Sequence, residues 1–571
     1  MPKNRLWKKG LVFCIIILFV GANVVSGLNI QLKNTTYPSS SYTGNILYVG
    51  GSGPGNYSSI QEAIYNASDG DTVFVFSGTY EQAEIGIVKR INLIGENRNT
   101  TIIREHNGRS IIRFYVDGIT VSGFTLEEIA SINEVQHILD IYSSNNIITN
   151  NIFKADGKPA MSIEVGRKYN IIADNIVLKQ CWFVIGGMYT TVRNNTFIDS
   201  YGIIIGLNTG HIVENNTING KPIYYYHHQQ NISVPLDASQ VILLSCENFI
   251  IENIIFTNTV EGIYLDHSSN IIIRNNTITG SLKSGIELDD SSFNIISNNI
   301  ISNNGEYGLN IWHTSCVENF VSKNIITDNS EMGIYDLGTK TTISENYIAN
   351  NSRCGIFDVG TETTISENYI ANNGYGIDIW TDSNTITSNI ITNNINGGII
   401  IDISNSNKIE NNTITNNGER GIYLIYGDFW GYGGWERETS NNNYIYGNFI
   451  SGHKYGIRIL FDCNSNTIYH NNINYNSFGV FIDVSDGNNV FENNFIKNTK
   501  SLYFRTFRNF KLQIDRNYWD DWPFSGIPKK ISGKKALACI TIFFLLYRYY
   551  CFFIPFSIYD YHPVKEPYNI P

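Results

Sequence analysis

The chain has 571 residues, enough for a large folded core, and carries a formal charge of −11 with only 16% charged residues. A net negative charge gives no electrostatic footprint for nucleic acid, so nucleic-acid binding is excluded as an expectation. Because so few residues are charged, many surface positions must be Asn, Ser, Thr or Tyr.

Residues 1–27 have the composition of an export signal. Basic residues from Lys3 to Lys9 precede an apolar run from Leu11 to Val20, and the small pair Ser26-Gly27 follows. This order is typical of a secretory signal peptide. A retained N-terminal membrane anchor is the alternative. Residues 28–45, rich in Asn, Thr and Ser, are predicted to form a flexible leader.

Residues 46–105 are predicted to form an N-terminal cap and the first coils of a repeat structure. A strand at Ile46–Val49 precedes a glycine-rich turn and a short helix over Ile60–Ala67, where Ser58 and Gln61 have capping-box spacing. A cap is expected because bare strand edges at the end of a repeat protein invite aggregation. The turn lacks the G-x-G-x-x-G spacing and the following Lys-Ser/Thr of a phosphate loop, so nucleotide binding is not predicted.

An asparagine recurs in the short pattern apolar-x-x-Asn-x-apolar along most of the chain. Twelve of the fourteen intervals are 20 to 25 residues long, and the two longer ones indicate insertions near 221–237 and 427–440. A fixed period of this length is the signature of a solenoid. The recurring positions are Asn150, Asn175, Asn195, Asn216, Asn253, Asn276, Asn299, Asn324, Asn346, Asn368, Asn389, Asn412, Asn448, Asn471 and Asn494.

The residues around these asparagines predict strands. Mostly β-branched apolar residues lie three before and two after each Asn, separated by Asn, Ser, Thr and Gly, which are poor helix formers. A Gly-Ile or Gly-Leu pair follows about eight residues downstream, as at Gly285-Ile286 and Gly308-Leu309. We therefore predict an all-β fold over residues 106–520, a right-handed parallel β-helix solenoid of about 15 or more coils. Such a stack would be roughly 70 Å long at ~4.8 Å per coil.

Two roles are expected for the recurring asparagine. It tolerates the left-handed backbone conformation needed at a sharp corner between strands. Its amide can also donate and accept hydrogen bonds along a stack of identical residues in neighbouring coils.

Residues 521–571 are predicted to form a C-terminal capping segment. The run from Ala536 to Pro555 is strongly apolar, but Arg548 interrupts it, so no clean membrane-spanning stretch is present. We expect terminal strands that close this end of the solenoid. Attachment to a membrane through this segment is the alternative.

Equal offsets from the Gly-Ile pair predict neighbours on the surface, because the coils stack in register. The second and fourth residues after the glycine are expected to point outward. Over three successive coils, the second, fourth and fifth positions bring together Tyr264, Glu287 and Asn310, then Asp266, Asp289 and Trp312, then His267, Asp290 and His313. In a later coil, Asp378 and Trp380 occupy the second and fourth positions.

Two interpretations of this patch stay open. In a sugar-binding groove, carboxylates would bind hydroxyl groups and aromatic rings would stack on pyranose faces. Crowded carboxylates would also raise one another's pKa, which acid catalysis of glycoside chemistry requires. The alternative is a solvated outer face whose polar residues prevent aggregation.

A glycine-rich loop between Asp428 and Ser440 carries further aromatic residues. Trp430 and Trp435 in this loop would suit contact with a glycan or a partner protein if they are exposed. The loop could equally fold onto the flank of the solenoid and fill a groove.

Several motifs resemble those of NosD-like surface proteins of archaea and bacteria, which belong to the pectin-lyase-like group of parallel β-helices. The N-terminal signature is Ile60-Gln61-Glu62-Ala63-Ile64, followed by Gly70-Asp71-Thr72-Val73 and Gly78-Thr79-Tyr80. The insertion starting at Gly220-Lys221-Pro222 and the tail around Asn517-Tyr518-Trp519 are also similar to those of NosD-like chains. The resemblance covers about residues 45–571.

The resemblance implies a secreted, often carbohydrate-associated protein, and the family name carries an association with copper delivery to nitrous oxide reductase. Copper sites need clustered His, Met or Cys. Here Met161, Met188 and Met332 are far apart, His227-His228 is the only adjacent His pair, and the eight cysteines show no C-x-x-C spacing. We therefore predict no metal site and no cofactor.

The motifs of two enzyme classes within this architecture are not found. Polysaccharide lyases usually place an Arg or Lys base near calcium-binding acids, whereas Arg274 and Lys283 do not share an offset with the acids here. The Asp-Pro-His-Asp sequence of alginate epimerases is absent.

We expect an exported or cell-surface protein that binds extracellular carbohydrate or another partner in the cell envelope. One alternative is a polysaccharide lyase, hydrolase or epimerase that acts through Asp266, Asp289 and Asp290. Further alternatives are a copper-associated maturation factor of the NosD type and a surface rod with a purely structural role.

Overall fold

The computed structural model describes residues 44–542 and 548–570, apart from 83, 107–109, 130–136, 156–159, 207–209, 426–438, 507–510 and 525–526. The predicted export signal, nearly all of the predicted leader, and the loop with Trp430 and Trp435 lie outside the described residues. Within the described part of the chain, no helix combines the length and apolar character needed to cross a membrane.

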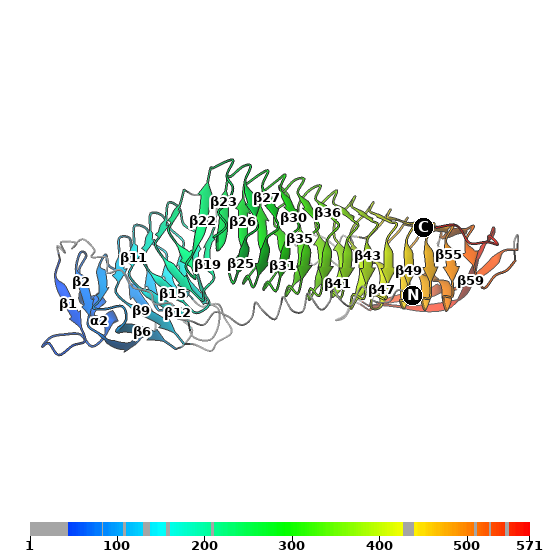
Figure 1. Cartoon of the computed structure of the whole chain (residues 1–571). Coiled ribbons are helices and arrows are strands. Elements are labelled where there is room, and N and C mark those ends of the chain that lie inside the picture. Colours follow the sequence, from blue (N-terminus) through cyan, green and yellow to red (C-terminus); the bar gives the residue numbers. More distant parts are fainter. Residues whose placement is uncertain are drawn as a thin grey trace, which may run out of the picture. The chain divides into compact units, whose positions relative to one another are not determined.

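The chain forms a parallel β-solenoid of about 19 turns, as predicted, with coil stacked on coil (Figure 1). In the first half the strands form three sheets. One contains β1 (Ile46–Val49), β2 (Thr72–Val75), β5 (Asn92–Gly95), β8 (Thr120–Ser122), β11 (Ile147–Thr149), β14 (Ile171–Ala173), β17 (Thr191–Arg193) and β20 (Ile212–Glu214). Another contains β4 (Ile85–Ile87), β7 (Ile112–Phe114), β10 (His137–Ile141), β13 (Ala160–Val165), β16 (Cys181–Ile185) and β19 (Gly202–Ile205). The remaining strands are β3 (Gly78–Glu81), β6 (Thr101–Glu105), β9 (Thr125–Glu128), β12 (Ile152–Ala155), β15 (Ile176–Leu178), β18 (Thr196–Ile198) and β21 (Thr217–Ile218).

The second half repeats this arrangement, and we name its sheets 1, 2 and 3. Sheet 1 contains β22 (Lys221–His227), β23 (Gln240–Leu244), β26 (Ile263–Asp266), β29 (Ile286–Asp289), β32 (Leu309–Ile311), β35 (Met332–Asp336), β38 (Cys354–Asp358), β41 (Tyr375–Ile379), β44 (Gly397–Asp402), β47 (Arg420–Ile425), β50 (Tyr455–Ile459), β53 (Phe478–Asp483), β56 (Lys500–Thr506), β59 (Lys529–Ile542) and β60 (Arg548–Asp560). Sheet 2 contains β24 (Ile250–Glu252), β27 (Ile272–Arg274), β30 (Ile295–Ser297), β33 (Phe320–Ser322), β36 (Thr342–Ser344), β39 (Thr364–Ser366), β42 (Thr385–Thr387), β45 (Lys408–Glu410), β48 (Tyr444–Tyr446), β51 (Thr467–Tyr469), β54 (Asn489–Phe491) and β57 (Gln513–Asp515). Sheet 3 contains β25 (Ile255–Thr257), β28 (Thr277–Thr279), β31 (Ile300–Ser302), β34 (Ile325–Thr327), β37 (Tyr347–Ala349), β40 (Tyr369–Ala371), β43 (Ile390–Thr392), β46 (Thr413–Thr415), β49 (Phe449–Ser451), β52 (Asn472–Asn474), β55 (Asn494–Ile496) and β58 (Tyr518–Trp519).

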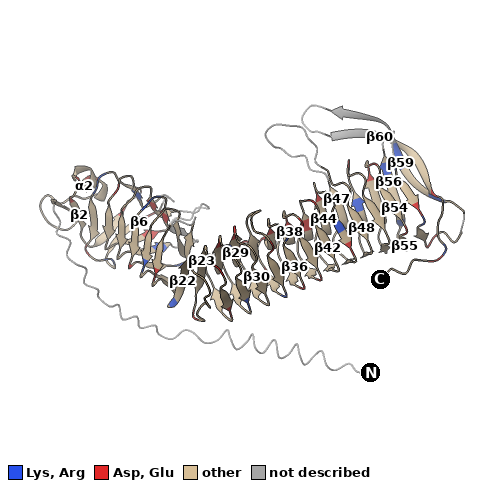
Figure 2. Cartoon of the chain, turned by 90° about the horizontal axis from the view of Figure 1, so that it is seen from above, with Lys and Arg blue, Asp and Glu red and all other residues tan. Residues whose placement is uncertain are grey.

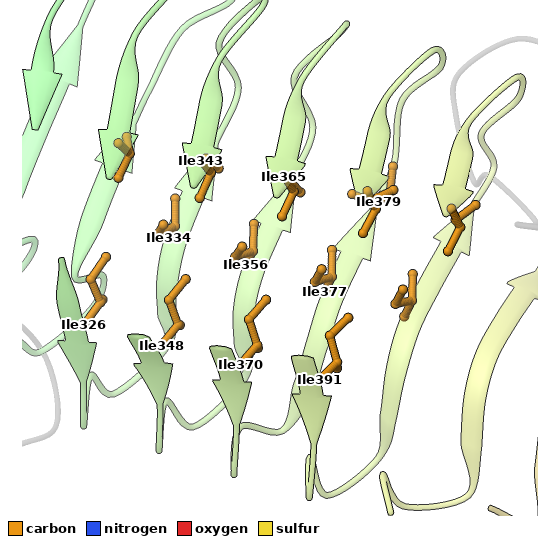
Figure 3. Packing of buried hydrophobic residues seen from close by; sticks show 14 of the residues in the cluster. Ile326, Ile334, Ile343, Ile348, Ile356, Ile365, Ile370, Ile377, Ile379 and Ile391 are labelled. Atoms are coloured by element: carbon orange, nitrogen blue, oxygen red, sulfur yellow. The ribbon is translucent and has the colours of Figure 1, made fainter. Parts of the chain in front are cut away.

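The core consists of columns of inward-facing side chains, mostly isoleucine. Ile326, Ile348, Ile370 and Ile391 form one such column from sheet 3, and isoleucines of sheets 1 and 2 face it across the interior (Figure 3). Their side chains are fully buried. β-Branched residues suit this position because they pack well on a pleated surface. Separate hydrophobic clusters fill the first and second halves.

A short helix, α2 (Ile60–Asn66), lies close to where the sequence predicts it. Its buried residues Ile60, Ala63 and Ile64 join the hydrophobic cluster of the first half. The N-cap is Ser59, whose hydroxyl accepts a hydrogen bond from the Glu62 N–H, and not Ser58 as the capping-box spacing predicts. Gln61 instead bonds to both backbone groups of Gly86 in a neighbouring coil, which fixes the helix against the first coils.

The recurring asparagines form a buried hydrogen-bonded ladder. Asn299 Oδ1 accepts hydrogen bonds from the backbone N–H of Asn276 at 2.9 Å and from its side-chain amide at 3.1 Å. The Asn276 amide also donates to the Ile251 carbonyl at 2.9 Å. In the second half the same pattern links Asn276, Asn299, Asn324, Asn346, Asn368, Asn389, Asn412, Asn448, Asn471, Asn493 and Asn517.

The predicted left-handed conformation belongs to a different residue from the ladder asparagine. It falls one position earlier, as at Asn275 (φ 56°), Asn298 (φ 55°) and Lys323 (φ 56°). The prediction that one residue serves both roles is therefore wrong. The chain must turn before the ladder residue so that its amide can point along the stack. Accordingly, the predicted positions Asn150 and Asn253 are left-handed residues with φ of 54° and 59°.

The ladder of the second half ends on a buried carboxylate. Asp560 Oδ2 accepts hydrogen bonds from the Asn517 backbone N–H at 3.0 Å, the Asn517 amide at 3.3 Å and the Trp519 indole N–H at 3.0 Å. Its other oxygen accepts from the backbone N–H groups of Arg516 and His562, each at 3.1 Å. A carboxylate suits this place because its oxygens only accept hydrogen bonds, and the groups that Asn517 turns toward it are N–H donors.

The C-terminal residues fold back onto the last coils. β59 pairs with β56 through Arg505 and Lys534, and then forms an antiparallel hairpin with β60. Beyond it, the backbone of Tyr568 exchanges two hydrogen bonds, each of 2.8 Å, with the side chain of Asn494. Asn494 thus holds the C-terminal tail, and Asn493 takes the ladder position predicted for it.

Two carboxylates occupy core positions in adjacent coils. Asp336 and Asp358 pair in register, and the column continues into Ile311 on one side and Ile379 on the other. Both are fully buried. In each, one oxygen accepts hydrogen bonds from a turn glycine N–H and a threonine hydroxyl, whereas the other oxygen has no partner. Burial raises the pKa of Asp336 to about 6 and, together with the Asp336 charge, the pKa of Asp358 well above its ordinary value.

We predict that Asp560→Ala lowers the stability of the last coils. The change leaves buried donors of Asn517 and Trp519 without an acceptor, and each such group costs about 1–3 kcal/mol. The melting temperature by circular dichroism should therefore fall by several degrees. Asp521→Ala removes an exposed carboxylate of the same region and is the matched control. Equal melting temperatures of the two variants would contradict the role given to Asp560.

We also predict that the buried pair makes the protein less stable as the pH rises toward neutrality. A carboxyl group whose pKa is higher in the folded than in the unfolded chain contributes its stabilisation below the unfolded pKa. This contribution is lost as the pH rises through the folded value, which is about 6 for Asp336. The side chains in the double variant Asp336→Asn/Asp358→Asn cannot ionise at these positions. Its melting temperature should therefore fall less than that of the wild type between about pH 5 and pH 7.5, roughly the two pH units around the ionisation of the pair. Parallel curves would refute the prediction.

Candidate ligand-binding face

The outer side of sheet 1 carries most of the residues predicted to bind a ligand. Tyr264 and Asp266 on β26 pair in register with Glu287 and Asp289 on β29, and Glu287 pairs with Asn310 on β32. Strands paired in this way lie roughly 4.8 Å apart.

Two histidines and their carboxylate partners lie at the ends of these strands. His267 Nδ1 forms a short ion pair with Asp266, and its Nε2 lies 3.6 Å from Asp290 Oδ2. His313 Nδ1 is 2.9 Å from Asp290 Oδ1. The structure therefore brings Asp266, His267, Asp290 and His313 into one connected group, and their role in binding stays a prediction.

The electrostatics of this group favour shared protons. The hydrogen bond to Asp266 raises the pKa of His267, with a further contribution from the charge of Asp290. Burial raises the pKa of Asp289, and the charges of Asp266 and Asp290 add to this shift. The raised pKa of His267 favours its imidazolium form beside these carboxylates, which together offer hydrogen bonds to hydroxyl groups.

Some residues at the second and fourth positions are less accessible than the sequence predicts. Asn310 is only 4% exposed and Asp266 only 3%. Tyr264 packs against the hydrophobic cluster of the first half, which also includes the outward-facing Ile242 of β23. The end of the first half therefore covers the outer side of the first coils of sheet 1. The open part of this face begins around Asp289 and Trp312.

Sequence reasoning missed Glu261, which is 3% exposed and lies at the turn before β26. Burial raises its pKa to about 8, with a contribution from Glu287. Burial likewise raises the pKa of Glu287, which accepts a hydrogen bond from the Ser284 hydroxyl at 3.1 Å. The signal in the sequence is the position directly before the coil glycine, because this residue shares the outer face with the second position after it.

Farther along sheet 1, these two positions and the fourth position after the glycine build an aromatic stack. Tyr335 lies with its ring centroid 5.2 Å from Tyr307, 5.5 Å from Phe357 and 5.8 Å from Trp312. Phe357 lies 5.6 Å from Trp380. Trp312 and Trp380 are 47% and 37% exposed, so the stack, which we call the aromatic stack (Tyr307, Trp312, Tyr335, Phe357 and Trp380), is open to solvent at both tryptophans.

Asp378 lies beside the aromatic stack. Its Oδ1 accepts a hydrogen bond of 3.1 Å from the Trp380 indole N–H. Burial raises the pKa of Asp378 to about 7, with a further contribution from Asp402. This carboxyl group therefore exchanges its proton near neutral pH next to an exposed ring.

Other concave or ligand-like sites lie elsewhere. A pocket of about 430 Å³ is lined by Lys179, Asp199, Tyr201 and neighbours, and contains none of the predicted residues. Among the described residues, one group of three potential metal ligands is found, formed by His137, Asp140 and Glu164. Asp140 in this group also pairs with the Arg113 guanidinium at 2.9 Å, so an ion-pair network accounts for it.

Family models match most of the repeat region. A model described as "Right handed beta helix region" matches residues 180–342 and 336–429, and one described as "Periplasmic copper-binding protein (NosD)" matches residues 432–523. With the parallel coils seen here, they define a right-handed parallel β-helix protein. Over residues 432–523 the chain is similar to NosD proteins, and the matches together support a NosD-like member of this class. No curated protein matches the chain.

Solved structures with similar coils come from enzymes, at low similarity. The periplasmic alginate epimerase AlgG is 12% identical, with a TM-score of 0.28, 76% of this chain and 78% of that chain covered. Pectin methylesterase PemA from Erwinia chrysanthemi is 13% identical, with a TM-score of 0.27 and coverage of 40% and 82%. The A-module of the Azotobacter vinelandii mannuronan C-5 epimerase AlgE4 is 13% identical, with a TM-score of 0.21 and coverage of 72% and 88%.

The residues of the NosD-matched segment do not fit a copper site. His453 is buried in a ladder position, where its side chain contacts Asn417 and Asn476, and burial lowers its pKa to about 4. His470 is paired with Glu492 at 2.9 Å, and Cys463 is a separate buried thiol. The three-residue group described above, His137, Asp140 and Glu164, lies outside this segment.

We predict that Asp266→Asn lowers the pKa of His267, because the hydrogen bond to Asp266 is the main cause of its elevation. The measurement is an NMR titration of the imidazole carbon-bound protons. Asp290→Asn should have the smaller effect, since Asp290 lies 3.6 Å from the ring nitrogen. A His267 pKa that is the same in Asp266→Asn and wild type would show that the pair does not form in solution.

Proposed function

We propose that the protein is exported or displayed at the cell surface and binds extracellular carbohydrate or another partner in the cell envelope along sheet 1. The observation that carries this proposal is the aromatic stack. Exposed indole rings at Trp312 and Trp380 lie beside carboxyl groups that can accept or donate hydrogen bonds. This combination suits a ligand with apolar ring faces and many hydroxyl groups.

The geometry of the repeat supports a polymeric ligand. Trp312 and Trp380 lie on different coils of the same face, with Tyr335 and Phe357 between them. A row of rings at coil spacing offers several equivalent contacts to a chain molecule. Many weak contacts of this kind raise the apparent affinity for a repeating ligand.

Export is supported by two observations of different kinds. The first 27 residues have the basic, apolar and small regions of a signal peptide. The NosD family, whose model matches residues 432–523, is described as periplasmic.

A catalytic role is the second candidate. Asp289, Glu261, Glu287 and Asp378 all have raised pKa values, and glycoside chemistry requires such carboxyl groups as proton donors. Glu261 and Glu287 lie in the covered part of the face, so Asp289 and Asp378 are the accessible candidates for a catalytic acid or base.

The test is retention of the protein on a panel of neutral and acidic polysaccharides, with released products measured in the same incubation. We expect saturable retention that falls at least about tenfold in Trp312→Ala/Trp380→Ala, since stacked aromatic rings dominate such contacts. Tyr444→Ala removes an exposed ring of sheet 2 and should bind like the wild type.

The other possible outcomes of this test distinguish a catalytic role from a purely structural one. Product release that is lost in Asp289→Asn or Asp378→Asn, with an unchanged melting temperature, would establish the catalytic candidate. Absence of both retention and products would overturn the proposal in favour of a structural surface element.

A further inference from the structure

The outer side of sheet 1 changes character along the solenoid. Around β26 and β29 its charged residues are carboxylates, whereas over β47, β50, β53 and β56 they are mostly cations. Figure 2 shows blue segments gathered among the coils between β44 and β59. We name the cations of these later coils, with the rings between them, the basic–aromatic patch. Its cations are Arg420, Lys454, Arg458, Lys500 and Arg505, and its rings are Tyr423, Tyr455, Phe478, Phe481 and Tyr503.

Cations and rings alternate in the register of the strands. In the column of the second position, Tyr423, Arg458, Phe481 and Tyr503 follow one another on successive coils. In the column before the glycine, Arg420 is followed by Tyr455, Phe478 and Lys500. The two columns lie side by side on the outer face. Because Tyr423 and Phe481 are buried, a ligand on this face would mainly meet the rings of Tyr455, Phe478 and Tyr503, with cations in the same or an adjacent coil.

The guanidinium of Arg458 lies at the centre of the patch. Its Cζ is 4.8 Å from the ring centre of Tyr455, 5.5 Å from that of Tyr423 and 5.9 Å from that of Phe481. The described residues supply no ion-pair partner within 4.0 Å, and its buried Nε has no hydrogen-bond partner. Rings on several sides hold the guanidinium in place, and the described residues leave its charge without an ion-pair partner.

The neighbouring charges do not neutralise the patch. Glu419 pairs with Arg420 at 2.7 Å and with Lys454 at 2.5 Å, and the buried Asp483 pairs with Arg505. Among the described residues on these strands or directly before them, the five cations of the patch thus have only two carboxylates as ion-pair partners. Lys534 of β59 is exposed and adds a further charge next to Arg505. In a chain with a formal charge of −11, this local excess of positive charge is a specific feature.

We propose that the basic–aromatic patch binds an acidic polysaccharide, with carboxylate or sulfate groups on the Arg458, Arg505 and Lys500 cations and sugar rings against Tyr455, Phe478 and Tyr503. The proposal rests on glycan binding by sheet 1 and adds the class of glycan. A planar guanidinium binds carboxylate or sulfate oxygens through two parallel hydrogen bonds. The interleaved rings favour a ring-bearing polymer over a linear polyphosphate, which has no apolar face to pack against them.

The experiment is calorimetric titration of the full-length chain with three soluble polymers of similar length, namely polygalacturonate, dextran sulfate and neutral dextran. The two acidic polymers distinguish carboxylate from sulfate recognition. We expect at least one of them to bind, with an affinity that falls as NaCl is raised from 50 to 300 mM because salt screens exposed charges (the Debye length falls from roughly 14 to 6 Å). Arg458→Gln should weaken this binding about tenfold or more.

Two further variants keep the result interpretable. Lys500→Gln alters an exposed side chain, so it tests the patch even if Arg458→Gln proves less stable. Lys408→Gln removes an exposed cation from sheet 2 at the coil just before the patch, and should bind acidic polymer within about twofold of the wild type, as expected for a remote surface charge.

Three results would overturn the proposal. One is unchanged affinity of both Arg458→Gln and Lys500→Gln for the acidic polymers. Another is binding of neutral dextran equal to that of the acidic polymers. The third is binding to vesicles of anionic phospholipid that depends on Arg458 while neither acidic polymer binds. The Trp312→Ala/Trp380→Ala variant separates this proposal from the general one. If it loses neutral-glycan binding while the patch variants change nothing, glycan binding stands and the acidic class fails.

Discussion

The hydrogen bond between stacked asparagine amides is the interaction on which this fold depends. At each corner a left-handed residue turns the chain, and the next residue's N–H then points along the stack with no strand partner of its own. The asparagine of the following coil accepts this N–H and the side-chain amide at once. A buried donor without a partner is costly, so the period of the sequence follows from the need for an acceptor in every coil. The same need explains why the ladder ends on Asp560 and not on another asparagine.

Fixed register turns sequence offsets into surfaces. Because the ladder and the glycines hold every coil at the same phase, the residues directly before and two after each glycine form two neighbouring columns on sheet 1. Most of the aromatic stack and of the basic–aromatic patch lies in these columns, a few coils apart, whereas Trp312 and Trp380 lie at the fourth position after the glycine. The acidic, aromatic and basic regions of this face thus differ only in which side chains the columns contain. The same backbone thus presents several different side-chain environments, one after another, along one face of the solenoid.

The fold was largely predictable from the sequence, whereas the site was only partly so. The period, the Gly-Ile marker and the alternation of β-branched residues are local signals, and they placed Asp266, Asp289, Asp290 and both histidines on adjacent coils. The burial of Tyr264 was not predictable, because it arises from packing of the first half onto sheet 1 across a long separation in sequence. Glu261 and Tyr307 were missed because the position before the glycine was not counted as part of the face. The separation of the left-handed residue from the ladder residue also requires backbone angles, since Asn commonly occupies both places.

The core beneath the aromatic stack carries a further constraint. Tyr335 and Phe357 are each followed directly by an inward carboxyl group, Asp336 and Asp358, in β35 and β38. An isoleucine at these positions would continue the apolar column at no electrostatic cost, as Ile311 and Ile379 do on either side. The carboxyl groups instead bond to the glycine and threonine of the turn that follows, Gly338 and Thr341 in one coil and Gly360 and Thr363 in the next. They therefore fix the turn directly after the strands that present the rings. Ionisation of these carboxyl groups becomes costly as the pH rises through about 6, so the stability of the coils that hold the aromatic stack depends on pH in this range.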